Sequence, residues 1–201
     1  MHPDILSKEQ KDLLPLMQQF KREFYLVGGT AIALHIGHRR SIDFDLFKKT
    51  NLNVAKTLKK LNTANIPYIV TRRVSEQVNL IMNAVKITFF QYPYTIETNV
   101  NFENTFRMPN LLTLAAMKAF ALGRKWKDYV DLYFILKDYY SIKDISTEAD
   151  KIFGQLFSEK LFRAQLAFHK DIDFTEPVEY MPGFEADEQK IKDFLIDRSL
   201  Q

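Results

Sequence analysis

The chain has 201 residues, of which 46% are hydrophobic and 26% charged, a balance that suits one domain or two closely packed subdomains with a substantial core. The net charge of +3 is compatible with a nucleic-acid partner without requiring one, and the absence of cysteine excludes disulfides and thiolate metal sites. The polar start is unlike a signal peptide and no run of about 18 apolar residues predicts a membrane span, so we expect a cytoplasmic protein with no membrane partner.

The first predicted element is a helix over residues 7–21. It opens with Ser-Lys-Glu-Gln, a capping-box pattern, and Leu13, Met17 and Phe20 recur near one stripe. We expect this apolar stripe to pack against a sheet. Pro15 lies inside the pattern, so the helix either kinks there or begins later.

The stretch over residues 24–47 organises the rest of the chain. It reads as a strand, a glycine turn, a short helix, a basic loop and a second strand. Successive side chains of a strand alternate between its faces, so Asp43 and Asp45 share one face while Phe44 and Leu46 share the other. The sequence therefore predicts two carboxylates side by side, and we expect the active site there.

The paired carboxylates indicate a metal site. Two such charges about 7 Å apart repel each other by roughly 2–3 kcal/mol at an effective dielectric constant near 20, a penalty that a divalent cation removes. Mg²⁺, or Mn²⁺ in its place, prefers hard oxygen ligands and commonly combines one or two carboxylates with phosphate oxygens of a substrate. Asp43 and Asp45 are therefore the predicted metal ligands.

A glycine pair precedes the acidic strand. Gly28 and Gly29 follow an apolar run and permit a tight turn from strand to helix, with Thr30 at the start of that helix. Amide groups at the start of a helix favour phosphate. We expect these three residues to hold the phosphates of a nucleotide.

The middle of the chain predicts a helix followed by three strands. Val54, Leu58 and Leu61 recur at helical spacing within residues 53–64. The following strand patterns cover residues 68–71, 78–82 and 85–90, and residues 82–84 form a candidate hairpin turn.

One lysine interrupts the apolar helix predicted over residues 111–122. Lys118 lies on a surface where an unpaired ammonium group is costly, so an anionic partner is expected. The side chain either extends to solvent or pairs with a structural carboxylate, or it contacts a triphosphate or the strand aspartates.

A second acidic pair follows. Asp128 and Asp131 are three residues apart and share one helical face, where they form a solvated surface, hold Lys118 or Arg124, or orient a base or ribose. Trp126 is expected in the core.

The remainder predicts helices over residues 152–168, with a break near Ser158, and over 187–200. Strand patterns give way to helices near residue 106. The fold class is therefore α+β, with a small mixed sheet flanked by helices in a catalytic core (residues 1–106) and a helical subdomain (residues 107–201) that completes a cleft.

Three spaced segments resemble the nucleotidyltransferase superfamily, and more narrowly the AbiEii/AbiGii toxin family. They are Gly28-Gly29-Thr30-Ala31, Gly37-His38-Arg39-Arg40-Ser41 and Asp43-Phe44-Asp45-Leu46-Phe47, and the run over residues 124–133 resembles a later motif of the same family. The resemblance implies the nucleotidyltransferase fold and transfer of an NMP from an NTP to an acceptor hydroxyl. It implies catalytic roles for Asp43, Asp45 and Lys118, and nucleotide binding by Gly28, Gly29, Thr30, Arg39, Ser41, Arg124, Asp128 and Asp131.

The same resemblance implies the toxin of a toxin–antitoxin or phage-defence pair. Its partners would be a nucleotide, an RNA, tRNA or protein acceptor, and a cognate antitoxin. The family pattern places a third carboxylate at position 88, where this chain has Thr88, and Glu97 is a candidate substitute. Two alternatives stay open: a protein of this fold that binds nucleotide or a partner without turnover, and a small-molecule transferase of the antibiotic-modifying kind.

Overall fold

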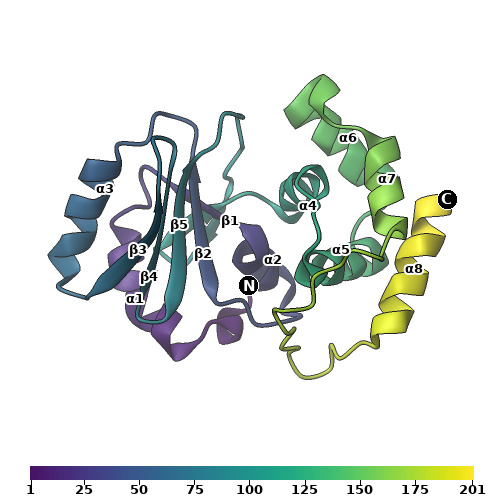
Figure 1. Cartoon of the computed structure of the whole chain (residues 1–201), viewed down its shortest axis with the longest axis horizontal. Helices are drawn as coiled ribbons and strands as arrows, with labels where there is room; N and C mark the ends of the chain where they lie inside the picture. The colour runs from purple at the N-terminus through teal and green to yellow at the C-terminus, as the bar shows by residue number, and fades with distance from the viewer.

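The structure is a computed structural model that describes residues 1–201, and it confirms the α+β class and the small mixed sheet flanked by helices (Figure 1). The strands are β1 (Tyr25–Val27), β2 (Asp43–Lys48), β3 (Tyr68–Arg73), β4 (Gln77–Met82), β5 (Val85–Gln91), β6 (Val100–Phe102) and β7 (Phe106–Met108). The helices are α1 (Lys8–Gln18), α2 (Gly28–Ile36), α3 (Val54–Leu61), α4 (Leu111–Phe120), α5 (Trp126–Asp138), α6 (Ile142–Phe153), α7 (Glu159–Ala167) and α8 (Glu188–Leu200). Short 3₁₀ turns cover Pro3–Ile5, Asn62–Ala64 and Gly154–Leu156.

The main sheet has the order β1-β2-β5-β4-β3. Strands β2 and β5 are parallel, and the other neighbours are antiparallel. Phe44 and Leu46 of β2 are almost fully buried, as are Ile87 and Phe89 of β5. This apolar face fixes the register, so the alternate side chains of both strands lie on the opposite face.

Local sequence signals explain several element boundaries. Ser7 and Gln10 form the predicted capping box at the start of α1, and Pro15 lies within that helix without ending it. Asn53 caps α3. The hairpin between β4 and β5 turns at Asn83 and Ala84, which both have positive φ, as a two-residue turn requires.

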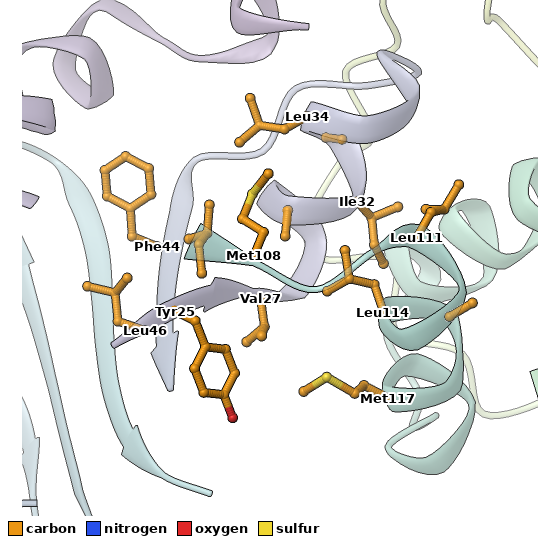
Figure 2. Close-up of a cluster of buried hydrophobic side chains, with 14 of the residues drawn as sticks. Tyr25, Val27, Ile32, Leu34, Phe44, Leu46, Met108, Leu111, Leu114 and Met117 are labelled. Carbon is orange, nitrogen blue, oxygen red and sulfur yellow. The ribbon is translucent and has the colours of Figure 1, made fainter. Parts of the chain in front are cut away.

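The helical part shares one hydrophobic core with the sheet. Helices α4 to α8 gather on one side of the sheet, while α3 lies on the other (Figure 1). Figure 2 shows Val27 and Ile32, from β1 and α2, next to Leu114 and Met117 of α4. The predicted boundary at residues 106/107 falls inside β7, and the division into two subdomains stays a prediction. No helix combines the length and the apolar character needed to cross a bilayer.

After α7 the chain runs back toward the sheet before it enters α8 (Figure 1). We refer to residues 168–187 as the returning segment. The Asp173 amide donates to the Arg124 carbonyl at 2.7 Å, and the Arg40 amide donates to the Glu179 carbonyl at 2.8 Å. The segment is therefore anchored both before α5 and beside the loop that leads into β2.

Candidate active site

The structure places Asp43 and Asp45 on one face of β2, opposite Phe44. Asp43 is in register with Lys86 of β5, and Asp45 with Thr88. Both aspartates line a cavity of about 400 Å³. The carboxylates are therefore accessible to a ligand rather than packed in the core.

The electrostatics of this pair are unfavourable when no cation is bound. Burial, and then the charge of Asp43, raise the pKa of Asp45 to about 6. Burial also raises the pKa of Asp43, and its Oδ1 atom is buried without a hydrogen-bond partner. An unpartnered buried carboxylate oxygen is costly, and Lys86, Lys127 and Lys125 offset that cost only in part because the pKa of Asp43 stays raised, so an additional cation is favoured at the pair.

The aspartate pair fits a hard divalent cation. No group of three or more His, Cys, Asp or Glu side chains converges as a complete ligand set. Mg²⁺ and Mn²⁺ do not need one, because they commonly complete their coordination with water and substrate phosphates. The unpartnered oxygen of Asp43 and the raised pKa of Asp45 are the features expected of such an incomplete site.

The glycine turn allows the close approach of Asp45. Gly28 has φ +71°, and a Cβ there would lie 2.3 Å from Asp45 Oδ2. A Cβ at Gly29 would lie 2.4 Å from a terminal nitrogen of Arg39. Helix α2 begins at Gly28, so the Asp45 carboxylate lies at a helix N-terminus, which favours its negative charge.

Thr30 and Ser41 lie behind the carboxylates and join α2 to β2. Their hydroxyl oxygens are 2.8 Å apart, and the Thr30 hydroxyl donates to the Asp43 carbonyl oxygen. Both residues are buried. The structure therefore gives them a part in fixing the position of Asp43, and the phosphate contact that the resemblance implies stays a prediction.

A second group of charges surrounds Asp131 of α5. We call it the Asp131 cluster, consisting of Asp131, His38, Arg39 and Lys118. Arg39 Nε and Nη2 donate to the two carboxylate oxygens at 2.7 and 2.9 Å, and His38 Nε2 is 2.8 Å from Oδ1. Burial opposes ionisation of Asp131, yet Arg39, Lys118 and His38 hold its pKa well below the usual range. The cluster is buried apart from the partly exposed Lys118, and the charges of Arg39 and Lys118 are balanced by Asp131 together with Asp128, which also pairs with Lys118.

Lys118 connects the Asp131 cluster with the open carboxylates. Its Nζ is 2.5 Å from Asp128 Oδ1 and 3.2 Å from Asp131 Oδ2, so both acids hold Lys118, one of the arrangements that the sequence left open. Lys118, Asp128 and Asp45 also line a second, mostly apolar cavity of about 270 Å³. Its aromatic lining consists of Phe47, Phe90 and Tyr92.

Several residues predicted to bind nucleotide lie elsewhere. Arg39 is only 2% exposed and is bound to Asp131, so the structure gives it no access to a ligand. His38, considered for a phosphate contact, is equally buried. Arg124 is exposed and pairs with Asp171 at 3.4 Å, and it lines neither cavity at the carboxylates. The sequence pattern did not reveal that Arg39 is buried in the core and that Arg124 is exposed at the surface.

The position expected for a third carboxylate is beside Asp45, and it holds Thr88. The parallel register of β2 and β5 puts these two residues opposite each other. Glu97 does not substitute, because it lies on a different cavity with Thr113 and Glu148. Strand β5 therefore contributes a hydroxyl where the family pattern has an acid.

Sequence reasoning missed Lys86 and the three aromatic residues beside the carboxylates. Lys86, Thr88 and Phe90 alternate along β5, so a period-two reading of that strand would have placed Lys86 and Phe90 on the aspartate face. Lys125 of the first cavity comes from the start of α5, and no local pattern predicts that approach.

Comparison with known proteins identifies the family. The family model described as "Nucleotidyl transferase AbiEii toxin, Type IV TA system" matches residues 16–198. The uncharacterized protein aq_aa25 of Aquifex aeolicus (strain VF5) is 25% identical over 198 residues, covering 92% of this chain and 86% of that protein. Two solved structures from Helicobacter pylori share the fold. One is a candidate nucleotidyltransferase with a TM-score of 0.56 and 18% identity, and the match covers 96% of this chain and 92% of that chain. The other is JHP933, with a TM-score of 0.56 and 17% identity, and the match covers 97% of this chain and 92% of that chain. Because the family model covers nearly the whole chain, the protein belongs to the AbiEii nucleotidyl transferase toxin family.

Proposed function

We propose that this protein transfers an NMP from an NTP to an acceptor hydroxyl in a metal-dependent reaction. The observation that carries the proposal is the buried, unpartnered Oδ1 of Asp43 beside Asp45, whose pKa is raised to about 6. A folded chain maintains such a pair of repelling acids at a cost, and binding of a cation with a phosphate-bearing substrate removes that cost.

The roles of the residues follow from their positions. Asp43 and Asp45 would hold the cation, which when bound supplies positive charge to the phosphate oxygens. The backbone of Gly28 lies next to Asp45, and Gly28 and Gly29 form the start of α2, where phosphate is favoured. Lys118, held by Asp128 and Asp131, is placed to stabilise negative charge that develops on the triphosphate.

The reaction is an in-line displacement at the α-phosphorus. The acceptor oxygen forms a bond to phosphorus, the bond to the β-phosphate oxygen breaks, and pyrophosphate leaves while the hydroxyl proton passes to solvent. Thr88 cannot accept that proton at neutral pH, so catalysis rests on positioning and charge stabilisation. The apolar cavity with Phe47, Phe90 and Tyr92 offers aromatic surface for the nucleobase.

The family description implies a toxin with an antitoxin counterpart. We infer that the acceptor is an RNA or tRNA end or a protein hydroxyl, and that transfer to it arrests growth. Expression in a host cell tests this, because growth arrest that depends on Asp45 supports the toxin, whereas resistance to an antibiotic supports a small-molecule acceptor.

Incubation of the purified protein with each labelled NTP, Mg²⁺ or Mn²⁺, and total RNA tests the enzymatic proposal. We expect transfer of label by the wild-type protein and loss of transfer in Asp45→Asn. Glu97→Gln is the matched control, because it also replaces an acid by an amide but lies on a different cavity. Absence of transfer with every NTP, to RNA and to cellular protein, would contradict the proposal.

Thr88 motivates a second candidate, a protein that binds nucleotide without turnover. In that case the wild-type protein binds NTP and metal through Asp43 and Asp45 but transfers nothing. Thr88→Asp distinguishes the two candidates, because it restores the acid of the family pattern beside Asp45. Transfer that appears only in this variant favours the binding protein.

A further inference from the structure

Three lysines converge on Glu176 of the returning segment. Their Nζ atoms approach the Glu176 carboxylate to 3.2 Å (Lys127), 3.5 Å (Lys86) and 4.0 Å (Lys125). Lys86 belongs to β5, whereas Lys125 and Lys127 lie at the start of α5. One carboxylate therefore joins cations from the sheet and from the helical part, and it leaves an excess of positive charge.

This lysine group lies beside the predicted metal ligands. Lys86 is in register with Asp43, and Lys86 and Lys125 line the same 400 Å³ cavity as Asp43 and Asp45. The sheet order places the group on the β5 side of the aspartates, while the glycine turn lies on the β1 side. Cations are therefore available on the flank of the carboxylates opposite Gly28.

Glu176 is held in place by its segment and by the lysines alone. The segment is anchored on either side of it, at Asp173 and at Glu179, by backbone hydrogen bonds to Arg124 and Arg40. The Glu176 side chain is 36% exposed, and no hydrogen bond joins it to the backbone of another element. Burial acts to raise its pKa, but Lys127, Lys125 and Lys86 together lower it, so the group is an anion at neutral pH.

A partly exposed carboxylate held only by lysines is exchangeable for another anion. Ion pairs open to solvent contribute little to stability, typically below about 1 kcal/mol, and Lys86 and Lys125 are 55% and 65% exposed, so losing their pairs with Glu176 costs the fold little. A phosphate group carries more charge than a carboxylate and has more acceptor oxygens for the ammonium groups. Phosphate is also the chemistry expected next to Asp43 and Asp45.

We propose that Lys86, Lys125 and Lys127 form a phosphate-binding site on the β5 flank of the carboxylates, with Glu176 as the internal anion that an incoming phosphate displaces. Two sources carry this chemistry, the polyphosphate tail of a nucleotide and the backbone of a nucleic acid. Neither turnover nor a bound metal is required, so the site can be tested independently of the proposed transferase activity.

Metal-free binding at low salt tests the proposal with two probes, inorganic tripolyphosphate and a short single-stranded RNA. Glu176→Gln removes the internal anion, and we expect roughly three- to tenfold tighter binding of at least one probe, the gain typical of one lost competing charge near a protein surface. Glu179→Gln is the matched control, because it removes one charge from the same segment but that acid pairs with Arg40 at 2.6 Å. We expect less than a twofold change for it.

Lys127→Ala in the Glu176→Gln background identifies the cations responsible. It should abolish the gain, and with the single-stranded RNA it should also reduce the slope of log K against log salt by about 0.7. The probe that Glu176→Gln binds more tightly identifies the source of the phosphate, a nucleotide for tripolyphosphate and a nucleic acid for RNA. The proposal is overturned if Glu176→Gln binds both probes no more tightly than the wild-type protein does. The circular dichroism of the variant must match wild type for this comparison.

Discussion

Two groups of buried charge lie close together in this protein and differ in their balance. In the Asp131 cluster one carboxylate faces Arg39, His38 and Lys118, and its hydrogen-bonding capacity is filled. In the aspartate pair of β2, two carboxylates face each other and Asp43 Oδ1 has no partner. The Asp131 carboxylate is fully paired by groups of the chain, although Nδ1 of His38 is buried without a hydrogen-bond partner, whereas the carboxylate oxygen Oδ1 of Asp43 is left unpaired.

On the proposed function, the difference separates structural charge from functional charge. A buried ion pair with filled hydrogen bonds maintains one arrangement of the chain, and removing one partner leaves an uncompensated charge. A pair of like charges does not stabilise the fold without a ligand. It contributes favourable energy only when a cation binds. Mutations in the two groups should therefore move stability in opposite directions.

The largest effect is expected for Asp131→Ala. This change leaves the buried guanidinium of Arg39 without its carboxylate, and losing one partner of a buried pair typically costs about 3–5 kcal/mol. Urea unfolding followed by circular dichroism measures the loss. Asp128→Ala serves as the control, because Asp128 is partly exposed and pairs only with Lys118, so its loss should be clearly smaller. Equal losses in the two variants would contradict the distinction.

Asp45→Asn should have the opposite effect on the apo protein. Relief of the repulsion with Asp43 leaves apo stability unchanged or raised, while the stabilisation that Mg²⁺ gives the wild-type protein disappears. If the protein is a transferase, the transfer rate falls by at least about 10²-fold, as for loss of a major electrostatic contact in an active site. Thermal unfolding with and without Mg²⁺ measures the first effect. A variant that is less stable in the apo form and still responds to Mg²⁺ would place the cation elsewhere.

The pH dependence of stability sharpens the same comparison. The folded pKa of Asp45 is about 6, above its unfolded value of 3.8, so the folded state binds the proton more tightly. Its contribution to stability is therefore fully present below about pH 4 and is lost as pH rises through 6. Between pH 5 and 7.5 the unfolding free energy of the apo wild type should fall by about 1 kcal/mol relative to Asp45→Asn. A constant difference between the two proteins over this range would mean that Asp45 has an ordinary pKa.

The sequence predicted the parts of this site that depend on local periodicity. Alternation along β2 placed Asp43 and Asp45 on one face, and the family resemblance put Gly28 at the same site. Helix and strand boundaries agreed with the structure within a few residues for α1, α3, β4 and β5, because capping residues and a positive-φ turn mark them locally.

The sequence could not predict which charged residues become buried. His38, Arg39 and Arg40 are consecutive in the basic loop, yet His38 and Arg39 are enclosed around Asp131 while Arg40 reaches the surface. Which of these side chains becomes buried depends on Asp131 of α5, more than 90 residues later in the chain, and on the returning segment. Glu176 reaches the lysines through the same long-range packing, and no local pattern contains that information.

The smallest effect is expected for Arg124→Ala, which tests the nucleotide-binding role that the family resemblance implies for Arg124. Arg124 lies in the motif that resembles the family, but it is exposed and its partner Asp171 is an exposed acid at 3.4 Å. Such a pair contributes at most about 0.5 kcal/mol, so unfolding should be almost unchanged. Nucleotide binding should also stay within twofold of wild type, because the side chain lines neither cavity at the carboxylates. A loss of more than fivefold in nucleotide affinity would require Arg124 to turn toward the nucleotide on binding. Arg124, just before α5, would then have to be counted among the functional charges rather than the structural ones.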